Sequence, residues 1–268
     1  MAKKKPQPDD AITYPVSDEA PAFKILIIDI ETSANLAYVW RVWQQNVSTS
    51  QLVKEKEVIS FAAKWYGSDE VIFSSVFHDT KKKMVKKAWD LLNEADVVVH
   101  YNGKKFDIPH LNQEFLLAGM PPPVPFRQVD LLTTVRREYN FGHNKLDHVT
   151  QALGIGSKVE HEGFELWVAC MKNDPDAWER MKAYNIHDVG LTEQLYKRIL
   201  PWITQHPSHA AINGDMRCTN CGSSDLKKNG FQYTLTGRYQ RYRCGSCGAA
   251  VRDTKRQSGA PVTRTSSW

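Results

Sequence analysis

The apolar run from Phe23 to Ile30, FKILIIDI, restricts the fold of this chain more than any other segment. A short, continuous apolar run bounded by polar segments indicates a buried strand. Asp29 lies inside the run, and Glu31 directly follows it. Residues two apart on a strand share one face, so these carboxylates lie about 6–7 Å apart and repel each other unless a positive charge lies between them. Because acids at a strand end often face solvent, the pair alone does not decide a function.

The remaining periodicity predicts a mixed α/β fold. We expect strands at 23–30, 58–66, 71–77 and 96–101, and helices at 81–94, 107–118, about 130–139, 145–153 and 175–199. The second and third strands flank a turn at 67–69 and therefore form a hairpin. Asp174 suits the cap of the last helix, and Pro175 suits its first turn. This order of strands and helices indicates a mixed sheet covered by helices.

Composition divides the chain into a main domain, a small C-terminal module and polar connecting segments. We expect a flexible N-terminal arm at 1–22, the main domain at 23–200, a linker at 201–214, the module at 215–253 and a disordered tail at 254–268. No run approaches the roughly 18 apolar residues of a membrane span, and the N-terminus lacks the apolar core of a signal peptide. We therefore expect a cytoplasmic protein without a membrane partner.

Two further motifs place polar groups at the ends of predicted elements. The segment 101–109, YNGKKFDIP, leaves a buried strand and enters a helix at Asp107, where Asp is also favoured simply as an N-cap. On the last helix, Tyr184 and Asp188 are four residues apart and face the same side. His187 points elsewhere, so we expect it to pack or to lie at the surface.

Convergence of these acids at one sheet edge would create a divalent-metal site. The four candidate ligands are Asp29, Glu31, Asp107 and Asp188. Four carboxylates in one place require cations, and oxygen-rich sites suit Mg²⁺ or Mn²⁺. Two such ions about 3.5–4 Å apart stabilise the attacking and leaving oxygens of a phosphoryl displacement. Tyr184 would then orient the attacking water, because a tyrosine hydroxyl, with a pKa of about 10, stays protonated near neutral pH.

The motifs D-I-E-T, Y-N-G-x-x-F-D-x-P and Y-x-x-x-D resemble the three exonuclease motifs of the DEDD superfamily. The tyrosine four residues before the last acid matches the DEDDy branch, whereas the DEDDh branch has a histidine where this chain has Ala183. The similarity is closest to the 3′-5′ exonuclease domain of family B DNA polymerases. The segment from Lys145 to Lys158 is similar to the K-L-D-x-V…L-G…K segment of that domain. The resemblance covers roughly residues 23–200.

This resemblance implies an RNase H-like fold, a mixed sheet flanked by helices, and 3′-5′ hydrolysis of single-stranded ends by a two-metal-ion mechanism. It implies that two Mg²⁺ or Mn²⁺ ions are held, directly or through water, by Asp29, Glu31, Asp107 and Asp188, and that Tyr184 positions the water. It also implies that Thr32, Asn102 and Phe106 contact the substrate, although Phe106 equally suits an ordinary core position. No polymerase palm, fingers or thumb follows the motifs, so such an exonuclease would stand alone.

Four of the five cysteines form two C-x-x-C pairs separated by 22 residues. They are Cys218, Cys221, Cys244 and Cys247. This spacing indicates a zinc ribbon with one tetrahedral Zn²⁺ site. Residues 231–236 and 238–243 predict a hairpin across Gly237. Because about 40 residues bury too little surface to fold alone, the metal would supply the folding energy. Cys170 stands apart, and we expect a buried thiol.

The C-terminal module also carries the positive charge of the chain. Residues 215–268 contain ten Lys/Arg and three Asp/Glu, a charge of +7 against +5 for the whole chain. The segment RYQRYR interleaves cations that bind phosphates with rings that stack on bases. The pattern C-x-x-C…K-N-G…G-x-Y-Q-R-Y-R-C-x-x-C resembles the zinc ribbons of some insertion-sequence transposases, which implies nucleic-acid binding, with protein docking as the alternative. The candidate contacts are Arg238, Tyr239, Arg241, Tyr242 and Arg243.

The leading hypothesis is a free-standing, metal-dependent 3′-5′ exonuclease that prefers single-stranded DNA and carries a zinc ribbon that binds nucleic acid. The alternatives are an exoribonuclease of the same fold and a catalytically silent adaptor that binds nucleic acid or a polymerase. No residue decides between DNA and RNA. We further expect a polymerase or replisome component as a partner and a bacterial or phage-infected cell as the setting.

Overall fold

The computed structural model describes residues 23–159, 162–209, 211, 215–234 and 237–257, and it divides into two compact units. The first unit is Lys24–Tyr196. The second contains Phe23 and the chain from Lys197 onward. The expected N-terminal arm and the expected tail from residue 258 lie outside the described residues. Among the described helices, none combines the length and the apolar character that crossing a membrane requires.

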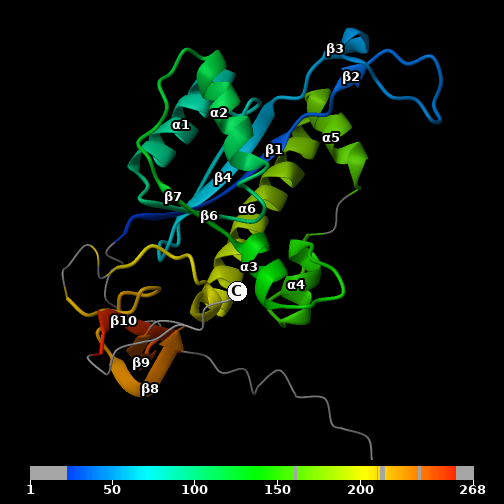
Figure 1. Ribbon diagram of the computed structural model, residues 1–268. Coiled ribbons are helices and arrows are strands. Elements are labelled where there is room, and N and C mark those ends of the chain that lie inside the picture. The colour runs from blue at the N-terminus through cyan, green and yellow to red at the C-terminus, as the bar shows by residue number, and fades with distance from the viewer. Residues whose placement is uncertain (1–22, 160–161, 210, 212–214, 235–236, 258–268) are drawn as a thin grey trace, which may run out of the picture. The chain divides into compact units, whose positions relative to one another are not determined.

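A mixed five-stranded sheet forms the centre of the first unit (Figure 1). Its strands, in spatial order, are β5 (Val71–Ser75), β4 (Val58–Trp65), β1 (Ile25–Thr32), β6 (Val97–His100) and β7 (Arg127–Asp130). β4 is antiparallel to β1 and β5, while β1, β6 and β7 are parallel. The predicted strands and the β4–β5 hairpin are confirmed. The sequence pattern does not predict β7, because RQVD has a single apolar residue, Val129.

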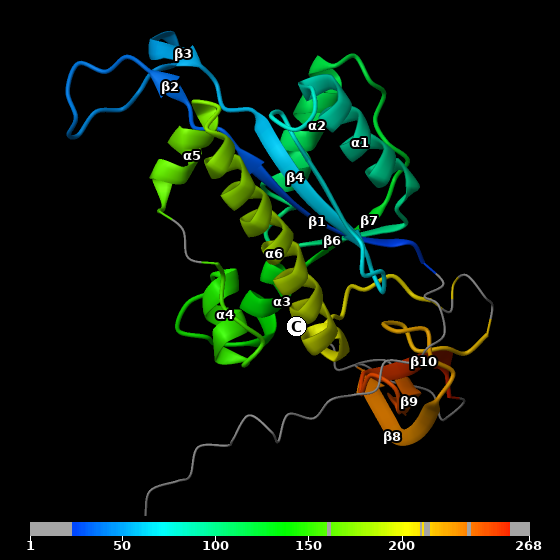
Figure 2. The same cartoon turned by 180° about the vertical axis from the view of Figure 1, so that it is seen from behind.

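Helices cover both faces of this sheet (Figures 1 and 2). In the described residues they are α1 (Lys81–Glu94), α2 (Asp107–Leu117), α3 (Leu131–Glu138), α4 (Leu146–Ala152), α5 (Phe164–Met171) and α6 (Pro175–Ile199). Leu92 of α1 and Leu111 of α2 belong to the apolar cluster on one face. Leu166 of α5 and Trp178 of α6 pack with Ile59 on the other. The sequence pattern does not predict α5, because the apolar residues of FELWVACM lie on nearly all its sides.

Local capping explains two helix starts and corrects a third. The Asp174 carboxylate accepts hydrogen bonds from the first backbone N–H groups of α6 at 2.9 and 3.2 Å, as predicted. Asp130 caps α3 in the same way. Phe106, not Asp107, occupies the N-cap position of α2, and no side chain caps that helix. The interpretation of Asp107 as an N-cap is therefore wrong, and its carboxylate makes a different contact.

A two-stranded arm follows β1. β2 (Leu36–Ala37) pairs with β3 (Leu52–Lys54), and the short 3₁₀ helix η2 (Thr49–Gln51) precedes β3. The connecting loop leaves Trp40 and Trp43 almost completely exposed. These indoles stand outside the apolar core that the rest of the unit buries.

The second unit contains a three-stranded antiparallel sheet in the order β10-β9-β8. Its elements are η3 (Leu200–Trp202), β8 (Leu226–Thr234), β9 (Gly237–Cys244) and β10 (Ala250–Arg256). The predicted hairpin is present, but Gly237 begins β9 instead of forming the turn. β10 was not expected, and it runs three residues into the segment assigned to a disordered tail. Ile203 and His209, within the expected linker, are buried, so this segment packs into the unit.

Candidate active site and cysteine cluster

The end of β1 presents the first two acids. β4 and β6 flank β1 and fix its backbone from both sides. Ile28 and Ile30 point into the apolar cluster beneath α1 and α2. Asp29 and Glu31 therefore share the opposite face, which α5 and α6 cover. The predicted placement of the two carboxylates on one face agrees with this register.

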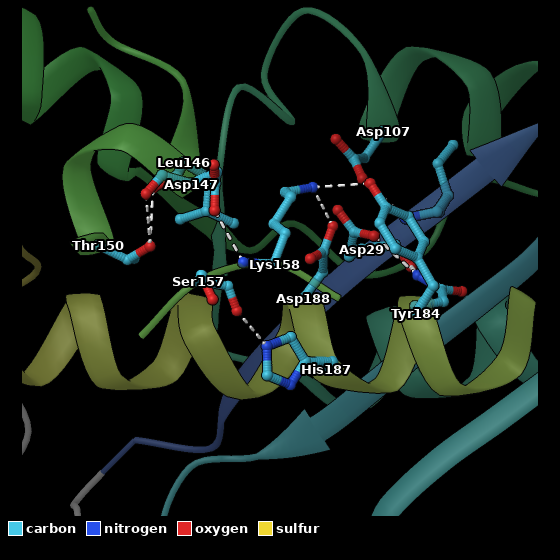
Figure 3. Close-up of polar contacts among 12 residues, drawn as sticks. Asp29, Asp107, Leu146, Asp147, Thr150, Ser157, Lys158, Tyr184, His187 and Asp188 are labelled. Atoms are coloured by element: carbon cyan, nitrogen blue, oxygen red, sulfur yellow. Dashed lines mark hydrogen bonds and ion pairs between the residues drawn. The ribbon is translucent and has the colours of Figure 1, made fainter. Parts of the chain in front are cut away.

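α6 crosses this face and brings Tyr184 and Asp188 to the same place (Figure 3). One carboxylate oxygen from each of Asp29, Glu31 and Asp188 lies within 4.8 Å of the other two. Asp107 is not in this group. Its Oδ1 accepts a hydrogen bond from the backbone N–H of Ile30 at 3.0 Å. Three predicted acids therefore meet directly, and the fourth ties the start of α2 to β1.

The group has the chemistry of a cation site. Asp188 is buried, and its Oδ1 atom has no hydrogen-bond partner. An unpaired buried carboxylate oxygen is costly unless a cation coordinates it. The donors are all oxygens, which suit hard divalent ions. The residues present therefore fit a divalent metal ion.

Burial and mutual repulsion oppose ionisation of these acids. Burial, followed by the charges of the neighbouring carboxylates, raises the pKa of Asp29 well above its usual value. Burial, followed by the charge of Asp188, raises the pKa of Glu31 to about 8. Burial also raises the pKa of Asp107 to about 7, although the hydrogen bond from Ile30 opposes the shift. Bound cations would reverse this penalty, because they favour the ionised forms.

Lys158 contributes a positive charge within the cluster (Figure 3). Its Nζ atom contacts Oδ2 of Asp188, donates to the Tyr184 hydroxyl at 2.8 Å and lies 4.8 Å from the centre of the Tyr184 ring. Burial, the largest single effect, lowers the pKa of Lys158, but Asp188 and Tyr184 together outweigh it and raise this pKa above its usual value. Sequence reasoning gave Lys158 no role in the site. The only sequence feature that could have indicated one is its position as the last lysine of the K-L-D…K segment.

Two contacts hold the Lys158 segment in place. The Lys158 backbone N–H donates to Oδ1 of Asp147 at 2.8 Å. Nε2 of His187 donates to the backbone carbonyl of Ser157 at 2.7 Å. The Lys-Leu-Asp segment and α6 therefore both position Lys158, and the expected packing role of His187 has a specific partner.

Tyr184 and two residues that sequence reasoning missed complete the site. Burial raises the pKa of Tyr184 above its usual value, which keeps its hydroxyl protonated. Asn185 is fully buried, and its Nδ2 atom donates to Oδ2 of Asp29 at 2.7 Å. The Trp167 side chain hydrogen-bonds Glu31 and meets the Tyr184 ring edge-on at 5.9 Å. Asn185 directly follows Tyr184 in the third motif, but Trp167 lies in the unpredicted α5.

An open cleft of about 420 Å³ lies beside the acids. It is lined by Thr32, Ser33, Ala34, Gly163, Phe164 and Trp167. Of the predicted substrate contacts in this unit, Thr32 lines the cleft, whereas Asn102 and Phe106 do not. Asn102 has a left-handed backbone (φ 69°), and Phe106 packs against the core with Lys56 5.8 Å from its ring centre.

The four cysteines of the second unit meet as predicted. Their Sγ atoms all lie within 4.8 Å of one another. Gly222 and Gly248 follow the two pairs with left-handed backbones, and each N–H donates at 3.0 Å to the carbonyl of the first cysteine of its pair. Four thiolates in two such turns suit a structural Zn²⁺ ion. Cys170 is fully buried and lies outside this cluster, as predicted.

Comparison with known proteins gives one family. The RNase H superfamily model matches residues 26–200. No curated protein matches the chain. The family B DNA polymerase from the hyperthermophilic archaeon Pyrobaculum calidifontis is a similar solved structure, with a TM-score of 0.51 and 20% identity. The similarity covers 67% of this chain and 25% of that chain, and at this identity it concerns the fold. Because the matched residues make up well over half of the chain and contain the acid cluster, the chain belongs to the RNase H superfamily.

Proposed function

We propose that the first unit is a metal-dependent 3′-5′ exonuclease that hydrolyses phosphodiester bonds at single-stranded ends, with a preference for DNA. One observation carries this proposal: three carboxylates meet beside a protonated tyrosine, and one of them, Asp188, has an unpaired Oδ1 atom. Membership of the RNase H superfamily supports a nucleic-acid substrate. The fold similarity to a DNA polymerase supports DNA.

In this proposal the side chains divide the work. Two Mg²⁺ or Mn²⁺ ions, when bound, would stabilise the attacking and leaving oxygens of the in-line displacement. Asp29, Glu31 and Asp188 would hold the ions, and Asp107 would contribute directly or through water. Tyr184 orients the attacking water and does not deprotonate it, because the raised pKa of its hydroxyl keeps that group protonated. Lys158 fixes the Tyr184 hydroxyl.

We place the terminal nucleotide in the cleft between Thr32 and α5. Its volume of about 420 Å³ lies within the range of ligand sites, about 300–1,000 Å³. Thr32 directly follows Glu31, and Trp167 contacts Glu31, so both walls adjoin the acids. Phe164 is largely exposed and offers a ring for base stacking.

The second unit, in the same proposal, is a zinc ribbon that holds nucleic acid. Four cysteines supply the ligands of one structural Zn²⁺ ion. The positive charge of residues 215–268 supports a polyanion as the partner. A polymerase or replisome component remains a proposed protein partner.

The direct test incubates the purified chain with end-labelled single strands and Mg²⁺ or Mn²⁺. Release of mononucleotides from the 3′ end is expected, and Asp29→Ala should abolish it. Release that persists in Asp29→Ala contradicts the assignment. Matched DNA and RNA strands that differ only at the 2′-OH decide between exonuclease and exoribonuclease. Retained binding without turnover in either metal favours the silent adaptor.

A further inference from the structure

The sheet of the second unit separates its cations by face. Directly paired residues of antiparallel strands point to the same side, so the register assigns each side chain to a face. One face carries Lys228, Arg238 and Tyr242. The opposite face, which we call the basic face, carries Tyr239 and five cations. These cations are Lys227, Arg241, Arg243, Arg252 and Arg256.

Cations of the basic face stand directly opposite one another. Lys227 pairs with Arg243, and Arg241 pairs with Arg252. Like charges in this position destabilise a sheet. Within the described segments, no salt bridge involves any of the five cations. The nearest acids in sequence are Asp225, two residues before Lys227, and Asp253, in the irregular stretch after Arg252. Because neither carboxylate forms a salt bridge with these cations among the residues that the structure describes, the repulsion suits an external anion.

Several of these cationic groups are held in fixed positions. Arg241 and Arg243 each donate to a backbone carbonyl oxygen at 2.8 Å, which leaves other guanidinium N–H groups available. The Arg252 guanidinium lies 4.4 Å from the centre of the Tyr239 ring. Fixed guanidinium groups suit phosphate oxygens. Because Arg252 covers the Tyr239 ring, this face favours phosphate contact over base stacking.

We propose that the basic face binds the sugar-phosphate backbone of nucleic acid without reading its bases. This inference rests on the proposed nucleic-acid role of the ribbon and narrows it to one surface. It adds Lys227, Arg252 and Arg256 to the contacts. It removes Arg238 and Tyr242, which point to the other side of the sheet.

The test compares two double variants of the full chain that lose equal charge. Arg252→Gln/Arg256→Gln alters the basic face, and Lys228→Gln/Arg238→Gln alters the opposite face. Binding of a labelled single strand is measured across salt concentrations without added Mg²⁺ or Mn²⁺. The basic-face variant should flatten the salt dependence by about 0.7 per lost contact, or about 1.4 in all, and the control should leave it unchanged. Equal effects in both variants, or no effect in the first, overturn the proposal.

Two further measurements make the result specific. Zinc content must match the wild type, so that unfolding of the ribbon is not mistaken for a lost contact. An abasic strand of equal length should show the same loss of affinity on basic-face substitution, and a loss confined to strands with bases overturns the backbone mode. The binding measurement does not require hydrolysis, so it tests the basic face even if the acid site is inactive. If the chain hydrolyses nucleic acid but the two double variants bind it equally, the basic-face proposal is contradicted and the proposed exonuclease function is not.

Discussion

The two candidate metal sites are built in opposite ways. The acid site gathers side chains from β1 and α6, whose acids Asp29 and Asp188 lie more than 150 residues apart in the chain, over a sheet that packs on its own apolar core. The cysteine site takes its ligands from two short turns in a unit with few buried apolar side chains. In the acid site the folded sheet holds the carboxylates together against their repulsion. In the cysteine site the bound metal would instead stabilise the fold of the unit.

This difference sets what each metal does for stability. Buried acids that are hard to ionise cost the fold free energy, which a rigid sheet has to offset. Clustered thiolates gain free energy from the metal, because a small unit has little else to stabilise it. Loss of the cysteine ligands should therefore destabilise the second unit, whereas loss of an acid should lower activity and stabilise the first unit.

The largest expected effect is loss of the ribbon fold on zinc removal. Structural Zn²⁺ contributes an apparent binding free energy of about 10–16 kcal/mol, so Cys218→Ser with Cys247→Ser should unfold the second unit. The first unit should keep its own thermal transition. Zinc content and limited proteolysis with peptide mapping measure the two outcomes. Cys170→Ala, outside the cluster, should retain the zinc. A ribbon that resists proteolysis without zinc would erase the contrast between the sites.

The acid site should show the reverse relation between function and stability. Asp29→Asn removes a charge that burial and neighbouring carboxylates oppose, so the first unit should melt at a higher temperature. Activity should fall about a thousandfold, because loss of a metal ligand removes several kcal/mol of transition-state stabilisation. Asp90→Asn, on the exposed side of α1, is the matched control and should change neither. A parallel fall of melting temperature and activity would mean that Asp29 is structural.

The pH dependence should also separate the sites. The folded-state pKa values of Glu31 (about 8) and Asp107 (about 7) exceed the usual values of 4.5 and 3.8. Between these limits the folded chain binds more protons than the unfolded chain, so its stability falls as pH rises, by about 1.4 kcal/mol per pH unit for each group. Mg²⁺ should flatten this fall. The ribbon should instead lose zinc as pH decreases, because thiolates are its ligands. Circular dichroism melts of wild type and Glu31→Gln test the first, and zinc release tests the second.

Lys158 tests whether the acid site balances its charge internally. Lys158→Met removes the cation that contacts Asp188, so divalent ions should bind more tightly and half-maximal activity should need several-fold less metal. The turnover number should fall about tenfold, because the Tyr184 hydroxyl loses its partner. Lys158→Arg keeps the charge and should retain the metal requirement. Unchanged metal dependence in Lys158→Met would show that the ammonium does not compete with the ions.

Sequence reasoning recovered the parts of the molecule that local chemistry specifies. The buried run of β1, the cap at Asp174 and the cysteine spacing each have a local cause. β7 escaped because its pairing with β6 comes from the tertiary fold and not from its own polar sequence. β10 escaped because its charged residues resemble a solvated tail. In both cases a strand forms through its neighbour.

The site divides in the same way. Motif spacing predicted the four acids and Tyr184. It could not predict that Asp107 accepts a hydrogen bond from the β1 backbone instead of joining the other three carboxylates. That difference depends on how α2 meets the backbone of β1. Trp167 was missed for a similar reason, because only folding places α5 against Glu31. Spacing predicts which residues share a face, whereas contacts between elements depend on packing.

The smallest expected effect concerns the cleft in which we propose that the terminal nucleotide lies. Phe164→Ala should raise KM about fivefold with little change in kcat, because stacking on one ring is worth about 1 kcal/mol at the lower end of its range. The side chain is largely exposed, so the fold should tolerate the change. Leu116→Ala, another exposed apolar residue on a helix, is the matched control. On a strand whose 3′-terminal residue is abasic, Phe164→Ala and wild type should have the same KM. An equal loss on that strand would show that Phe164 shapes the cleft without stacking on the base.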